Sequence, residues 1–88
     1  MDNGKTNVFD IKNINDIVVK QTIYEAVEAL EERGYNPINQ IVGYIISGDP
    51  GYISNYKETR QKLSKIDRTD IVEVLLRDYL KTEWDILD

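Results

Sequence analysis

Apolar residues recur every three or four positions along much of this chain, and two glycine-containing turns interrupt the pattern. A first apolar stripe predicts a helix from about residue 16 to residue 33, and its members are Val19, Ile23, Val27 and Leu30. Gly34 follows directly, at the place where glycine commonly ends a helix. The pattern therefore favours short helices separated by turns.

A second segment runs from Asn36 to Gly48 and has helix signals at both ends. Asn36 can cap a helix, and Pro37 suits its first position because no N–H is needed there. A β-strand is the competing interpretation, because β-branched residues are frequent here. The end signals favour a helix, and its strongly apolar character predicts that it forms the buried centre of the fold.

Two further helices are expected after the turn at residues 48–51. The first is basic and spans about residues 55–66, where Asn55 and Glu58 have capping-box spacing. The second begins near Asp67, and Asp70 falls in its first turn. Its apolar residues cover a wide arc, so we expect it to pack against the core and also against a second copy of the chain.

The predicted fold class is all-α, a compact bundle of four to five short helices that forms a homodimer. The two middle helices give it a helix-turn-helix-like element. We expect a flexible N-terminal arm at residues 1–13, a single helical domain at 14–82 and a C-terminal tail at 83–88 that contains Trp84.

Several classes of function are disfavoured by what the 88 residues contain. Cysteine and histidine are both absent, so the common nucleophiles, proton-transfer groups and metal ligands are missing. We therefore expect no catalytic residue, cofactor or metal site. The net charge of −5 disfavours nucleic acid as a partner, and no apolar run is long enough for membrane insertion, so a cytoplasmic location is expected.

A local positive surface is expected between residues 57 and 68, and three interpretations stay open. It can be a solvated helix face, a surface for a phosphate or an acidic partner, or the recognition helix of a nucleic-acid-binding module. The candidate partner- or phosphate-binding residues are Lys57, Arg60, Lys65 and Arg68. Phosphorylation of Thr6 in the arm would add about −2 charge, enough to dock the arm on such a surface.

Residues 34–50 read Gly-Tyr-Asn-Pro-Ile-Asn-Gln-Ile-Val-Gly-Tyr-Ile-Ile-Ser-Gly-Asp-Pro. This stretch resembles the hallmark of the IreB family of regulatory phosphoproteins from Gram-positive bacteria, and the resemblance covers essentially the whole chain. The motif positions are Gly34, Tyr35, Asn36, Pro37, Asn39, Gln40, Gly43, Tyr44, Ser47, Gly48, Asp49 and Pro50.

The resemblance implies an all-helical homodimer without catalytic activity. It implies that a PASTA-domain Ser/Thr kinase and its cognate phosphatase act on the protein, in the control of the cell envelope and of cephalosporin resistance. It also implies a link to Clp protease or an adaptor, through turnover of an enzyme of peptidoglycan precursor synthesis. Thr6-Asn7-Val8-Phe9 resembles the family's Thr-x-x-Phe form, which makes Thr6 the expected phosphorylation site.

The chain departs from the family pattern after residue 53. Ser54, Asn55 and Tyr56 stand where relatives often read Pro-Arg-His, and Ser64 replaces a later basic residue. The arginines at positions 60 and 68 are kept. We expect a partner that reads the full arginine pattern to contact this chain differently.

Overall fold

The computed structural model describes residues 11–81, with side chains from residue 14 onward, and every element within that range is helical. The elements are α1 (Ile11–Glu32), α2 (Pro37–Ser47), the 3-10 turns η2 (Pro50–Tyr52) and η3 (Tyr56–Glu58), α3 (Thr59–Ser64) and α4 (Arg68–Tyr79). The all-α prediction is therefore confirmed for the described part of the chain.

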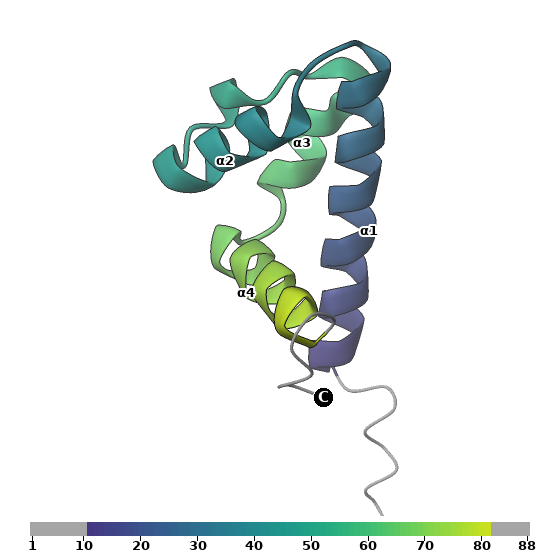
Figure 1. The fold of residues 1–88 in the computed structure, drawn as a ribbon, viewed down its shortest axis with the longest axis vertical. Coiled ribbons are helices and arrows are strands. Elements are labelled where there is room, and N and C mark those ends of the chain that lie inside the picture. Colours follow the sequence, from purple (N-terminus) through teal and green to yellow (C-terminus); the bar gives the residue numbers. More distant parts are fainter. Residues whose placement is uncertain (1–10, 82–88) are drawn as a thin grey trace, which may run out of the picture.

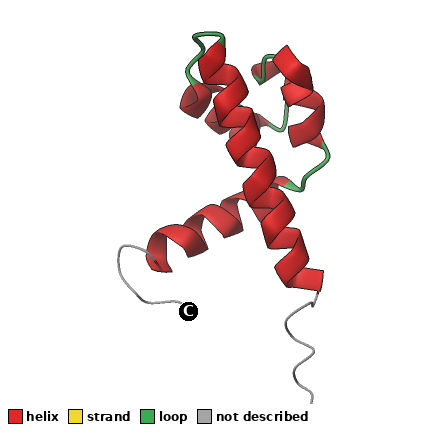
Figure 2. Ribbon diagram, turned by 90° about the vertical axis from the view of Figure 1, so that its right-hand side faces the viewer, coloured by secondary structure: helices red, strands yellow, loops and turns green. Residues whose placement is uncertain are grey.

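Helix α1 is the long axis of the molecule, and every other helix packs against it (Figure 1). Its 22 residues correspond to a length of about 33 Å. Helices α2 and α3 lie beside its C-terminal part, whereas α4 crosses its N-terminal half (Figure 2). The helix begins at Ile11, earlier than the apolar spacing predicts, so the bundle contains one long helix and not only short ones.

Polar contacts fix the crossing of α1 and α4. The guanidinium of Arg77 donates to the Asp16 carboxylate at 2.8 Å, and this pair is about three-quarters buried. Lys20 forms an ion pair with Asp78 at 3.0 Å on the surface. Because the Arg77 pair is the more buried of the two, it contributes more to the position of α4.

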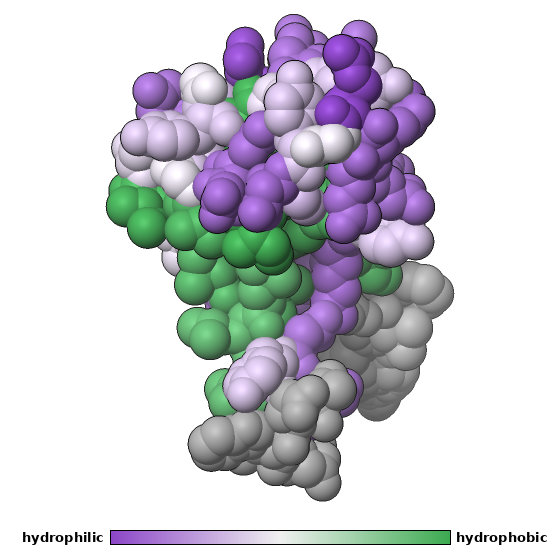
Figure 3. Space-filling model, turned by 45° about the horizontal axis from the view of Figure 1, so that its top comes forward, coloured by the Kyte–Doolittle hydropathy of each residue, from purple (hydrophilic) through white to green (hydrophobic). Residues whose placement is uncertain are grey.

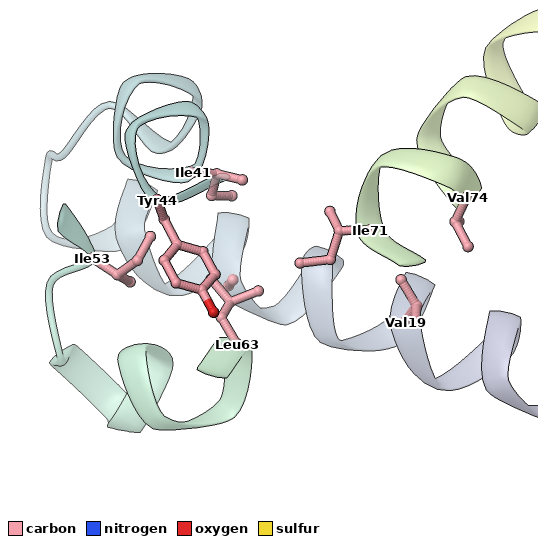
Figure 4. Close-up of a cluster of buried hydrophobic side chains, with 8 residues drawn as sticks. Val19, Ile41, Tyr44, Ile53, Leu63, Ile71 and Val74 are labelled. Carbon is pink, nitrogen blue, oxygen red and sulfur yellow. The ribbon is translucent and has the colours of Figure 1, made fainter. Parts of the chain in front are cut away.

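The core is a continuous apolar cluster that joins both ends of the molecule (Figure 4). Tyr44, Ile53 and Leu63 meet at the α2–α3 end, and Leu63 is fully buried. Val19 faces Ile71 and Val74 where α1 and α4 cross.

The prediction that α2 forms the buried centre is wrong. On this helix only Pro37, Ile41 and Tyr44 are buried. Ile38 and Ile46 are 68% and 78% exposed. The physical reason is that α2 packs with one side only, against α1 and η2, while α1 is the helix that α2, α3 and α4 all contact.

The prediction of a single helix at residues 55–66 is also wrong in detail. Its first part is the short turn η3, and α3 starts only at Thr59. Lys57 and Glu58 have positive φ angles of 55° and 62°, so the backbone is in the left-handed conformation at these two residues. The expected capping box does not form, because the Asn55 side chain makes no capping hydrogen bond.

Helix α4 follows the prediction closely. Asp67 occupies the N-cap position with an extended backbone, although its carboxylate makes no capping hydrogen bond, and Asp70 lies in the first turn. No helix within residues 11–81 has the length and apolarity required to cross a bilayer.

Candidate functional site

The first half of the motif at residues 34–50 starts α2 and ties it to the chain beyond. The side-chain oxygen of Asn36 accepts a hydrogen bond from the Asn39 amide at 3.1 Å, with Pro37 in the first turn. This confirms the predicted helix start. The Gln40 side chain accepts from the backbone N–H of Ser54 at 2.8 Å, which ties α2 to the segment that leads to α3.

The second half of the motif ends α2 through side chains that bond to nearby backbone. The Ser47 hydroxyl donates to the Gly43 carbonyl at 2.7 Å and accepts from the Asp49 amide at 2.9 Å. Asp49 in turn accepts from the Gly51 amide at 2.8 Å and caps η2. The turn is therefore built from short-range bonds that its own sequence supplies.

Two motif glycines allow another group to come close to the backbone. A Cβ atom at Gly43 would lie 2.6 Å from Cδ1 of Tyr52, so only glycine lets that ring pack on α2. A Cβ atom at Gly48 would lie 2.9 Å from Cζ of Arg68. Gly48 also has φ +78°, a left-handed conformation that favours glycine.

The two tyrosines of the motif have different environments. Tyr44 is buried in the core, whereas Tyr35 is 42% exposed in the turn between α1 and α2. Most motif side chains are thus engaged with the chain itself. The motif defines the shape of residues 34–53, and Tyr35 is a member that a partner can reach.

The four candidate cations do not form one cluster, because three of them contact different parts of the chain. Lys57 pairs with Glu32 at the end of α1 at 2.8 Å. Nε of Arg60 donates to the Ile53 carbonyl at 2.8 Å, and Nη1 of Arg68 donates to the Ile45 carbonyl at 2.8 Å.

Lys65 differs from the other three cations. Its side chain has no hydrogen bond or ion pair with another residue in the described range. Arg60 and Arg68 are bound to backbone carbonyls, which leaves their remaining N–H donors for other groups. The role of these four residues in binding a phosphate or a partner stays a prediction. The short α3 and its engaged cations add no specific support for the alternative of duplex binding.

A charged cluster joins the end of α1 to η3. Glu32 accepts from the Tyr56 hydroxyl at 3.1 Å and from Lys57, while the Arg33 guanidinium lies 4.8 Å from the centre of the Tyr56 ring. The hydrogen bond from Lys57, followed by that from Tyr56, holds the pKa of Glu32 below its ordinary value of 4.5. The same bond raises the pKa of Lys57.

A polar groove of about 610 Å³ lies next to this cluster, between α1 and the α3 region. Four glutamates and two lysines are among its lining residues, which are Thr22, Glu25, Ala26, Glu28, Ala29, Glu31, Glu32, Lys57, Thr59 and Lys62. Within the described range, no three potential ligands converge in a way that would hold a metal ion. The mixed charges of this lining are typical of a solvated helix face.

A second groove, of about 660 Å³, lies between α2 and α4 and is mainly apolar. Ile45 lines it from α2, while Val72 and Leu76 line it from α4. Figure 3 shows an apolar surface that continues from α2 onto α4 on this side of the molecule. The sequence analysis missed this groove because it predicted that α2 is buried in the core. The signal that could have revealed the groove was the breadth of the apolar stripe on α2, which is wider than one packing face.

Two predicted features lie outside the described residues. These are the phosphorylation site Thr6 in the arm and Trp84 in the tail.

Comparison with known proteins gives one family. The family model described as IreB regulatory phosphoprotein matches residues 4–81 of this chain. A protein of Acetivibrio thermocellus named UPF0297 protein is 42% identical over 81 residues, a span that covers 92% of this chain and 90% of that relative.

Proposed function

Because the chain belongs to the IreB family of regulatory phosphoproteins, we propose that it is a cytoplasmic, non-enzymatic regulator that is switched by phosphorylation. A PASTA-domain Ser/Thr kinase transfers a phosphate to Thr6, and a cognate phosphatase removes it. The phosphorylation state controls peptidoglycan synthesis through Clp-dependent turnover of a precursor-synthesis enzyme, and thereby cephalosporin resistance. The family match carries this proposal, since the matched span includes Thr6.

The structure supports the arm as the switch by making two other threonines poor substrates. The Thr22 hydroxyl lies within α1 and donates to the Val18 carbonyl at 2.8 Å. Thr59 is 2% exposed, and its hydroxyl donates to the Tyr56 carbonyl at 2.6 Å. Either residue would have to leave its helix before a kinase could reach it. Thr69, in the first turn of α4, is exposed.

The test is incubation of the whole chain with the cognate PASTA-kinase domain and ATP, followed by intact-mass measurement and peptide mapping. One phosphate on Thr6, lost in Thr6→Ala, is the expected result. Thr69→Ala serves as the matched control and should be phosphorylated like the wild type. A chain that takes up no phosphate, or takes it up at Thr69 and not at Thr6, would sink the proposed switch.

We also propose that the chain acts as a homodimer through the face formed by α2 and α4. On this face Ile38, Val42 and Ile46 of α2 and Leu76 of α4 are 45–78% exposed. An apolar surface of this kind on so small a protein favours self-association, which adds buried area to a modest core. A second copy fits because a two-fold dimer uses the same surface on both partners.

Sedimentation of the wild type at tens of micromolar should give the mass of two chains. Ile46→Lys should give the mass of one, because it places a charge at the most exposed position of the face. Tyr24→Lys is the control, since Tyr24 is 61% exposed on α1 outside this face. A monomeric wild type, or equal dissociation of both variants, would argue against this dimer.

A further inference from the structure

Arg68 makes an unusual contact at the point where α2 ends. It is the first residue of α4, and its guanidinium reaches across to lie against the backbone of Gly48. Its Nη1 donates to the carbonyl of Ile45 at 2.8 Å. This carbonyl belongs to the last turn of α2, where carbonyls have no partner within the helix. Arg68 therefore supplies a hydrogen-bond donor that α2 itself lacks.

The contact is also a polar connection between α2 and α4. It runs from the first residue of α4 to the last turn of α2. The apolar groove lies beside it, and both Ile45 and Arg68 line that groove. The Arg68 side chain thus bridges the two helices at this end of the groove.

We propose that Arg68 is a positioning residue, which holds the end of α2 against the start of α4 and so keeps the groove in the shape that a second copy fits. The part of this inference that puts a second copy in the groove rests on the proposed dimer. The contact between Arg68 and the end of α2 does not depend on it. It assigns to Arg68 a role different from binding a phosphate.

The chemistry of arginine suits this position better than that of lysine. The planar guanidinium can lie flat on the Gly48 backbone while one of its N–H groups bonds to the Ile45 carbonyl. The lysine ammonium is a compact, strongly hydrated charge and has no flat face. Arg68→Lys therefore keeps the charge that a phosphate site needs and removes the planar group that the contact with Gly48 and Ile45 needs.

The experiment measures two quantities on the whole chain: the dissociation constant of the dimer and the rate of amide hydrogen exchange in the last turn of α2. Arg68→Lys should weaken the dimer about tenfold, the equivalent of one lost hydrogen bond, and should speed exchange at the end of α2. Arg60→Lys is the matched control, because Arg60 also donates to a carbonyl but lies away from the groove. It should leave both quantities at the wild-type value.

Two glycine variants separate positioning from loss of stability. Gly48→Ala should weaken the dimer as Arg68→Lys does, because its Cβ displaces the guanidinium. Gly34→Ala strains a backbone with a similar φ of +79° but has no atom nearby, so it should leave the dimer intact.

Each remaining outcome counts against the proposal in a defined way. If Arg68→Lys has the exchange rate and the dimer dissociation constant of the wild type, Arg68 does not hold the end of α2. If exchange is faster but the dissociation constant is unchanged, the Arg68 contact does not shape the groove for the second copy. A wild type that stays monomeric would remove the proposed dimer, and the exchange rates of Arg68→Lys and Arg60→Lys would still decide whether Arg68 holds α2.

Discussion

Two regions of the molecule use the left-handed backbone conformation, and they stabilise it in different ways. Gly34 and Gly48 have φ angles of 79° and 78° where α1 and α2 end. Lys57 and Glu58 have φ angles of 55° and 62° before α3. Glycine reaches this conformation without a steric penalty, whereas a residue with a side chain loses about 1–2 kcal/mol.

The difference shows which parts of the chain depend on local sequence and which on distant contacts. At the end of α2, Ser47, Gly48 and Asp49 supply the turn bonds within a few residues. At the start of α3, the backbone is held by Tyr56 and Lys57, which both bind Glu32 on α1. The first arrangement can form alone, while the second needs α1 in place.

The largest expected effect comes from comparing the two glycines. Gly34→Ala should lower the free energy of unfolding by about 1 kcal/mol, since only backbone strain is added. Gly48→Ala should lower it by about 2–3 kcal/mol, because the same strain comes with loss of the Arg68 contact. Urea unfolding measures both values. Equal losses would mean that Arg68 contributes nothing here, and in an Arg68→Ala background the two losses should become equal.

The next effect compares two asparagines at predicted helix starts. Asn36→Ala should lower the free energy of unfolding by about 1 kcal/mol, since Asn36 caps α2. Asn55→Ala should change it by less than about 0.5 kcal/mol, because Asn55 makes no capping bond. Thermal or urea unfolding tests the pair. A larger loss in Asn55→Ala would reverse the conclusion about which start is built locally.

A smaller effect of opposite sign is expected at Glu58. Replacing it by glycine removes the cost of a side chain at positive φ, partly offset by the greater freedom of glycine in the unfolded chain. Glu58→Gly should therefore raise the free energy of unfolding by about 0.5–1 kcal/mol. Glu28→Gly, within α1, is the control and should lower it. A loss of stability in Glu58→Gly would mean that the left-handed pair is not strained.

The smallest effect is the pH dependence of the pair between Lys57 and Glu32. The pKa of Glu32 is lowered in the fold, so its stabilising effect is present above its ordinary value of 4.5 and is lost as the pH falls below it. The pKa of Lys57 is raised, so its effect persists up to its ordinary value of 10.5 and is lost above it.

Unfolding of the wild type and of Glu32→Gln across pH measures this contribution. The wild type should be the more stable protein at neutral pH, and the two should converge in acid and again in strong base. A difference that stays constant through the acid range would show that the ion pair does not stabilise the fold.

The same contrast explains how far the sequence predicts this molecule. The α2 boundaries follow from Asn36, Pro37 and Gly48, whose effects are local. The break before α3 could not be predicted, because nothing near Lys57 requires positive φ and the stabilising partner, Glu32, lies 25 residues earlier. The misplacement of α2 has a related cause. A wide apolar stripe predicts burial, but cannot say whether the cover is the same chain or another.

The candidate cations illustrate the limit for the site. Sequence identifies Lys57, Arg60 and Arg68 as a positive segment, yet Lys57 and Arg68 bond to groups 25 and 23 residues earlier, which only the fold brings near. Periodicity places side chains on the faces of one helix and cannot show which carbonyl of another helix they meet.

The length of α1 has a mechanical consequence. The α2–α3 end and the α4 end are both attached to one stiff rod of about 33 Å, and they touch it at opposite halves (Figure 1). A tilt of only 5° about one end of such a rod displaces the other end by roughly 3 Å, close to the diameter of a water molecule. The rod has the geometry of a lever arm. A slight change in the tilt of α1 where it packs beside α3 would displace its other end, where α4 packs, by several ångströms.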